Sequence, residues 1–113
     1  MKASLDTNVI IHLYKANLSN LLFERFEELL VYSFIREKEL NKHADTQILK
    51  AFDDNVAHGK IKLIDDSYLR KIRMYEKFIE HVNDNKLIYE ASDLGEVYAI
   101  ALARTLGAIS VVT

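Results

Sequence analysis

The chain has 113 residues and contains no cysteine, which excludes disulfide bonds, thiolate zinc sites and cysteine nucleophiles. It has no proline and only three glycines, Gly59, Gly95 and Gly107, each at an expected element boundary. No stretch approaches the ~20 apolar residues of a membrane span. The first six residues reach a charge before a signal-peptide core could form. We therefore expect a single cytoplasmic domain over residues 1–113, with no membrane contact.

A basic excess is also lacking, because 15 lysines and arginines stand against 17 acidic residues and the net charge is −2. This balance does not indicate a nucleic-acid binder, but local charge rather than the sum steers a substrate. The histidines are too dispersed for a local zinc motif. They are His12, His43, His58 and His81.

Short apolar segments alternate with helical patterns along the chain. This alternation predicts a three-layer α/β/α fold with a central parallel sheet. In such sheets ligands bind beyond the carboxyl ends of the strands, so polar residues there are the first to examine. Strands are expected at 2–5, 29–32, 61–64 and 109–112. The first two helices are expected to begin at Thr7 or Asn8 and at Ser19 or Asn20. Three further helices are expected, from the end of the second strand to Gly59, from Asp65 through Val82, and from Asp93 to Leu106.

Asp6 directly follows the first expected strand and precedes Thr7 and Asn8. Each of these three residue types is favoured as a helix cap, so capping alone is one interpretation. Three of them in succession exceed what one helix start requires. Asp6 is therefore a candidate functional carboxylate as well as a candidate cap.

Two further acids have both a structural and a functional interpretation. Glu39 lies on the expected long helix within a charged stretch, where Glu37 is an alternative. Glu96 stands three residues after Asp93, the spacing of a capping box. A carboxylate at a helix N-terminus is also stabilised in its ionised, metal-binding form by the helix dipole.

The order of these motifs resembles the PIN-domain family, to which many toxins of bacterial toxin–antitoxin pairs belong. The resemblance covers essentially the whole chain. It is carried by Leu-Asp-Thr-Asn-Val-Ile-Ile at 5–11, Ser33 with Glu39 and Leu40, Leu-Gly-Glu at 94–96, Ala-Ile-Ala-Leu-Ala at 99–103, Gly107–Ala108 and Ser-Val-Val-Thr at 110–113.

The resemblance implies that Asp6, Glu39 and Glu96 converge at the strand ends and hold Mg²⁺ or Mn²⁺, with metal-activated water cleaving RNA. Hard divalent cations prefer such oxygen ligands. It also implies a toxin ribonuclease, with RNA as substrate and an antitoxin protein or a second copy of the chain as partner. The supporting polar groups it implies are Asn8, Asp93 and Thr113.

One departure is that the family places a further acid just after a Val-Thr ending like that of this chain. We therefore expect either a truncated form of such a domain, or a protein that lacks the final acid and the last edge strand with its helix. A haloacid-dehalogenase-like phosphatase is disfavoured, because its general acid would fall at Asn8, which cannot transfer the proton. A catalytically weak PIN-like module that acts through protein contacts is the second interpretation, and the early ending at Thr113 favours it.

Overall fold

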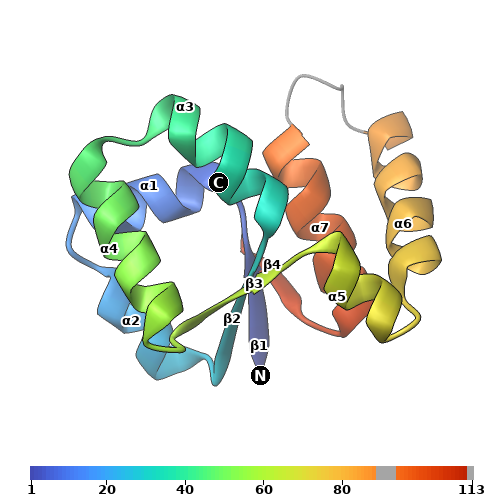
Figure 1. Cartoon of the computed structure of the whole chain (residues 1–113), viewed down its shortest axis with the longest axis horizontal. Helices are drawn as coiled ribbons and strands as arrows, with labels where there is room; N and C mark the ends of the chain where they lie inside the picture. Colours follow the sequence, from blue (N-terminus) through green and yellow to red (C-terminus); the bar gives the residue numbers. More distant parts are fainter. Residues whose placement is uncertain (89–93, 112–113) are drawn as a thin grey trace.

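A computed structural model describes residues 1–88 and 94–111 of the chain. Its centre is a four-stranded sheet in the order β3-β2-β1-β4, with every neighbouring pair parallel (Figure 1). The first strand is central, so Asp6, which follows it, stands at the middle of the sheet's carboxyl edge. The α/β fold expected from the sequence is confirmed. The strands are β1 (Lys2–Leu5), β2 (Glu28–Tyr32), β3 (Ile61–Ile64) and β4 (Ile109–Val111).

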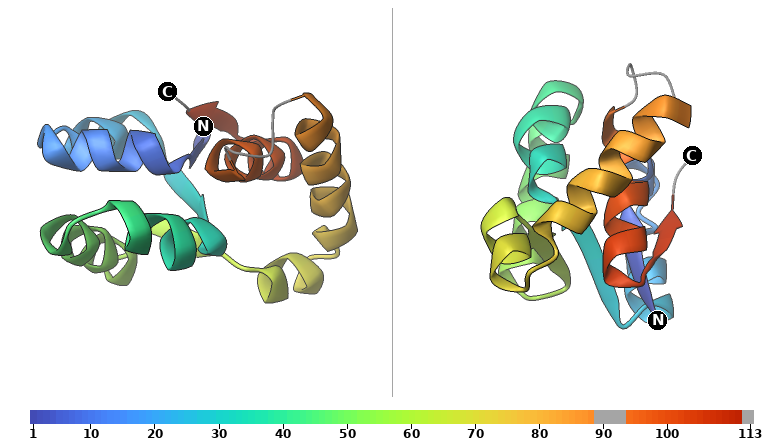
Figure 2. Two further views of the ribbon diagram at one scale, coloured as in Figure 1. Left: turned by 90° about the horizontal axis from the view of Figure 1, so that it is seen from above. Right: turned by 90° about the vertical axis from the view of Figure 1, so that its right-hand side faces the viewer.

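Helices cover both faces of the sheet. The connections from β1 to β2 and from β2 to β3 step across the sheet in one direction, and the connection from β3 to β4 returns in the other. Because such crossovers are right-handed, the two sets of helices must lie on opposite faces, as Figures 1 and 2 show. One face carries α1 (Thr7–Lys15), α2 (Ser19–Arg25) and α4 (Thr46–Ala57), and the other carries α6 (Tyr75–Ile88) and α7 (Leu94–Leu106).

The single helix expected between β2 and Gly59 is wrong. The segment instead forms a π-helix η1 (Ile35–Leu40), a short α3 (Asn41–His43), a break, and then α4. The break lies at Ala44, whose backbone is extended. Asp45 then caps α4, because its carboxylate accepts a hydrogen bond of 2.8 Å from the Ile48 amide. The apolar residues at helical spacing, which predicted one long helix, therefore lie on two separate helices.

The helix expected from Asp65 through Val82 is also divided. Asp65 does cap a helix, α5 (Asp66–Lys71), by accepting from the Tyr68 amide. The chain then turns at Arg73, which adopts the left-handed conformation with φ of 61°. A left-handed residue ends an α-helix, so α6 starts afresh at Tyr75. The two helices can consequently point in different directions (Figure 1).

The core lies on both faces of the sheet. Phe52 of α4 and Phe78 of α6 are fully buried, as is most of β1 and β2. A strand buried on both faces reads as a continuous apolar run, which is how the strand at 29–32 was predicted. Within residues 1–88 and 94–111, the helices are all too short or too polar to cross a membrane.

Candidate metal centre

Asp6 occupies the carboxyl end of the central strand and is buried, with 2% of its surface exposed. Its carboxylate accepts a 2.9 Å hydrogen bond from the Val9 amide and caps α1. Its own amide donates to the carbonyl of Val111 on β4, at 3.4 Å. The capping interpretation is therefore confirmed, and it coexists with a buried carboxylate at the switch between β1 and β4, where α/β sheets bind ligands.

The start of α7 is packed against the start of α1. A Cβ added to Gly95 would lie 2.8 Å from Oγ1 of Thr7, so only glycine allows this approach. A second tie lies one turn further along α7, where the buried Ser4 hydroxyl donates to the carbonyl of Ala99 at 2.8 Å. Because Thr7 and Gly95 are in contact, their sequence neighbours Asp6 and Glu96 are brought to the same end of the sheet.

Glu39 lies on a third element, η1, which packs against both α1 and α7. Its side chain is 25% exposed, and its Oε2 lies 3.6 Å from Nε2 of His43. Glu37 is exposed. Burial thus favours Glu39 over Glu37 as the acid on this element. The π-helical geometry is itself notable, because π-turns are rare and occur frequently at functional sites.

The three acids do not form a closed ligand set. In the part of the chain that the structure describes, no three histidine, aspartate or glutamate side chains are grouped so that they could hold one ion. Without a cation, clustered carboxylates repel one another. The contact between Thr7 and Gly95 brings Asp6 and Glu96 to one end of the sheet, whereas Glu39 lies on a separate helix, η1, beside His43.

The residues around Asp6 fit a hard divalent cation. Their donors are carboxylate and hydroxyl oxygens, which Mg²⁺ and Mn²⁺ prefer. Oγ1 of Thr7 is buried and has no hydrogen-bond partner within the described residues. Buried hydroxyls are normally satisfied, by ordered water where no protein group is near. A hydrated cation beside Asp6 would bring such a water.

Of the three supporting residues that the resemblance implies, only Asn8 lies in the described part of the chain. Asn8 lies in the first turn of α1 and is exposed. Asp93 and Thr113 lie outside the described residues. The capping box expected between Asp93 and Glu96 is therefore a prediction that the structure does not address.

Sequence reasoning missed an aromatic cluster beside η1. The ring of Tyr98 lies 5.0 Å from Tyr32 and 4.9 Å from Phe34, and Tyr32 lies 4.7 Å from Phe78. Burial, and then the hydrogen bond to Asp66, raise the pKa of Tyr32 well above its usual range. Burial likewise raises the pKa of Tyr98. These phenols therefore stay neutral, and their rings pack against each other between β2 and α7. The cluster left no sequence signal, because its rings come from distant positions.

The hydrogen bond from Tyr32 to Asp66, at 2.6 Å, ties β2 to α5. We expect Tyr32→Phe to lower the free energy of unfolding by about 1–2 kcal/mol, because a hydrogen bond to a charged acceptor is lost. Urea unfolding measures this loss. Tyr98→Phe is the control, since it removes a hydroxyl from the same cluster and that hydroxyl makes no hydrogen bond within the described residues. Equal losses in the two variants would contradict the assignment.

Comparisons with known proteins give no independent indication of the function of this site. No family model, curated protein or solved structure matches this chain. The function is therefore inferred from the residues described above.

Proposed function

We propose that the chain is a metal-dependent endoribonuclease, in which Asp6, Glu39 and Glu96 hold Mg²⁺ or Mn²⁺. The contact between Gly95 and Thr7 carries this proposal. It joins the N-terminal ends of two helices at the carboxyl edge of the central strand and brings two carboxylates from opposite ends of the sequence to that edge. A parallel α/β sheet binds its ligands at this place.

Each acid has a defined part in the proposed site. Asp6 is fixed by its cap hydrogen bond from Val9, and Glu96 lies in the first turn of α7. The positive ends of the α1 and α7 dipoles stabilise both carboxylates in the ionised form that binds metal. A bound divalent ion lowers the pKa of water and neutralises charge on a phosphodiester. In this proposal Glu39, from η1, would supply the third carboxylate.

Positive charge close to Glu39 supports a polyanionic substrate. Lys38 and Lys42 are exposed on η1 and α3 and flank Glu39 in sequence, and His43 contacts it. Lysines at such positions bind phosphates and steer an anionic chain even when the net charge is near zero. This local distribution supports RNA as the substrate.

The second candidate is a PIN-like module that acts through protein contacts, such as a toxin held by an antitoxin. It is favoured by apolar side chains on the surface of α2. Leu18 and Leu21 are 44% and 53% exposed. A protein partner would cover them, whereas RNA cleavage does not use them.

One assay separates the two candidates. The purified chain is incubated with a fluorophore–quencher single-stranded RNA in Mn²⁺, in Mg²⁺ and in EDTA. The nuclease proposal requires cleavage in either metal and none in EDTA. Cleavage that persists in EDTA would indicate a contaminating or metal-independent activity, and no cleavage in any condition would favour the protein-contact module.

A further inference from the structure

The turn between α5 and α6 carries a concentration of positive charge. Residues 60–77, which run from the start of β3 into the first turn of α6, hold six lysines and arginines against three acidic residues, although the whole chain has a net charge of −2. A hollow of about 410 Å³ lies at this turn and is lined by Arg70, Arg73, Tyr75 and Glu76. Pockets for small ligands have volumes of roughly 300–1,000 Å³. The hollow is therefore large enough for a small anionic ligand.

The two arginines of this hollow have no acidic partner within residues 1–88 and 94–111. No ion pair joins the guanidinium of Arg70 or of Arg73 to a carboxylate of this part of the chain. The guanidinium carbon of Arg70 lies 4.0 Å from the centroid of the Tyr75 ring. This cation–π contact holds the Arg70 side chain at the hollow without neutralising its charge.

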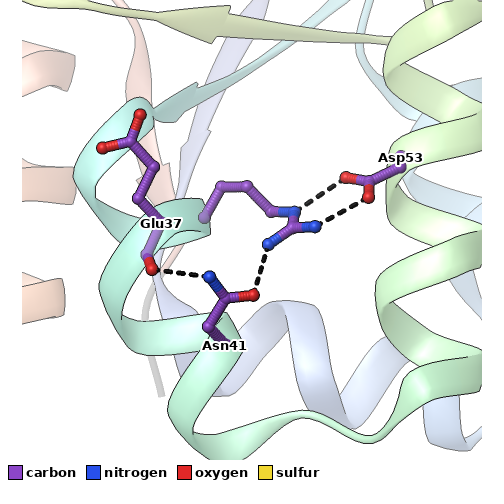
Figure 3. Close-up of polar contacts among 4 residues, drawn as sticks. Glu37, Asn41 and Asp53 are labelled. Atoms are coloured by element: carbon purple, nitrogen blue, oxygen red, sulfur yellow. Dashed lines mark hydrogen bonds and ion pairs between the residues drawn. The ribbon is translucent and has the colours of Figure 1, made fainter.

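Arg36 has the contrasting arrangement. Its Nε and Nη2 donate to Oδ1 and Oδ2 of Asp53, and its Nη1 donates to Oδ1 of Asn41, all at 2.7 Å (Figure 3). The Arg36 guanidinium is thus occupied by a carboxylate of the chain itself, in the bidentate geometry that guanidinium groups favour. Arg70 and Arg73 lack such a carboxylate, so a ligand can supply the anion.

Arg73 occupies a backbone position that glycine usually holds. Its φ is 61°, its amide donates to the carbonyl of Arg70 at 3.0 Å, and the amide of Met74 donates to the carbonyl of Leu69 at 2.8 Å. These two bonds form the Schellman motif that ends many helices. Its left-handed residue is usually glycine, because a Cβ is disfavoured there.

The other left-handed residues of the described chain belong to types that tolerate this conformation. They follow α1, α4 and α7, and they are Asn17, Gly59 and Gly107. Arg73 is the exception. Strained residues of this kind cluster at ligand clamps and active sites. A binding role for the Arg73 side chain accounts for an arginine where glycine would be more stable.

We propose that the hollow at the α5–α6 turn binds a small sugar phosphomonoester, that is, a sugar phosphate or a nucleoside monophosphate, with its phosphate between Arg70 and Arg73. Guanidinium groups bind phosphate oxygens through paired N–H donors. The Glu76 carboxylate lines the same hollow and accepts hydrogen bonds from hydroxyl groups, which favours a ligand with a sugar. The site uses none of the three acids of the proposed metal centre, so it goes beyond the proposed function and does not depend on it.

The experiment measures binding of AMP, ribose 5-phosphate and adenosine by titration calorimetry in EDTA, where a metal site contributes nothing. The two phosphorylated ligands should bind, and adenosine should not. Arg70→Gln and Arg73→Gly should each weaken AMP binding by ~10-fold or more, because hydrogen bonds between charged groups are lost. The matched control is Lys71→Gln, which removes the same charge from an exposed neighbour that does not line the hollow. The control should bind AMP as the unaltered chain does.

Thermal unfolding of Arg73→Gly gives the second measurement. Relief of the left-handed strain exceeds the entropy that glycine adds to the unfolded chain, so we expect Tm to rise by about 2–5 °C. A variant that binds less AMP while it is more stable has lost binding for a reason other than unfolding. The inference is overturned if neither phosphorylated ligand binds, if adenosine binds as tightly as AMP, or if Arg73→Gly binds AMP as well as Lys71→Gln does. A lower Tm in Arg73→Gly would also contradict it, because Arg73 would then be at its position for stability.

Discussion

Asp6→Asn should reduce metal-dependent RNA cleavage by ~10³-fold, because it removes a charged ligand worth several kcal/mol in the transition state. The fold should survive. Asparagine caps helices about as well as aspartate, so the hydrogen bond from the Val9 amide can be kept. Without metal, removal of a buried negative charge near Glu96 relieves like-charge repulsion. The measurements are initial cleavage rates in Mn²⁺ and urea unfolding in EDTA.

Asp45→Asn is the matched control for this prediction. Asp45 caps α4 by the same geometry, accepting from the Ile48 amide at 2.8 Å, but it is exposed and lies beside Lys15 at the C-terminal end of α1, whereas Asp6 caps the N-terminal end. It should keep full cleavage. Glu96→Gln should behave like Asp6→Asn. If Asp6→Asn and Glu96→Gln both cleave RNA at the rate of the control, these acids have no part in catalysis. If Asp6→Asn keeps full cleavage and Asp6→Ala unfolds more readily by ~1 kcal/mol, capping is the main role of Asp6.

The second large effect is expected from Gly95→Ala. The added methyl would lie 2.8 Å from Oγ1 of Thr7, and threonine is held stiffly at χ1, so α7 or α1 must shift. Overpacking of this kind costs about 1–3 kcal/mol. The gain in helix propensity from glycine to alanine is ~1 kcal/mol and offsets only part of it. We expect a net loss of stability in urea unfolding, together with weaker Mn²⁺ binding, because Glu96 moves with α7.

A double-mutant cycle identifies the cause. Thr7→Ala removes the oxygen that the new methyl would meet, so Thr7→Ala/Gly95→Ala should recover most of the lost stability. Thr7→Ala alone should change little, because that hydroxyl has no hydrogen-bond partner within the described residues. A Gly95→Ala variant as stable as the unaltered chain would show that the contact between α1 and α7 is loose. Additive effects in the cycle would lead to the same conclusion.

Much of the fold could be predicted because its strands are local patterns. β2 contains the continuous apolar run Leu29–Tyr32, β1 is a short strand that ends at Asp6, and Gly107 ends α7 with a left-handed conformation at φ of 68°. Helix continuity could not be predicted in the same way. The apolar stripe from Leu40 to Val56 keeps its period across the extended residue Ala44, because two helices that pack on one core can share a stripe. Arg73 carried no sequence signal for a left-handed turn.

The candidate site was predictable in part, for a related reason. Asp6 is fixed by position alone, since any residue directly after a central strand lies at the carboxyl edge. The approach of Glu96 depends on a close backbone contact, and Gly95 signalled it only through the absence of a side chain. Glu39 depends on a π-helix, which no pattern in its charged stretch predicts. The link from Arg36 to Asp53 joins residues that are seventeen apart, on two helices that the sequence had presented as one.

The pairing of β1 with β4 has a consequence for the order of folding. β1 precedes the other elements of the described residues, yet one of its two partners, β4, follows all of the helices described above. A parallel pairing between such distant segments forms slowly, because loop-closure entropy opposes it until the intervening helices have packed. The hydrogen bond from the Asp6 amide to the Val111 carbonyl can form only after α7 has packed against the sheet. The carboxyl edge of β1, where Asp6 lies, is therefore completed only when α7 and β4 have packed.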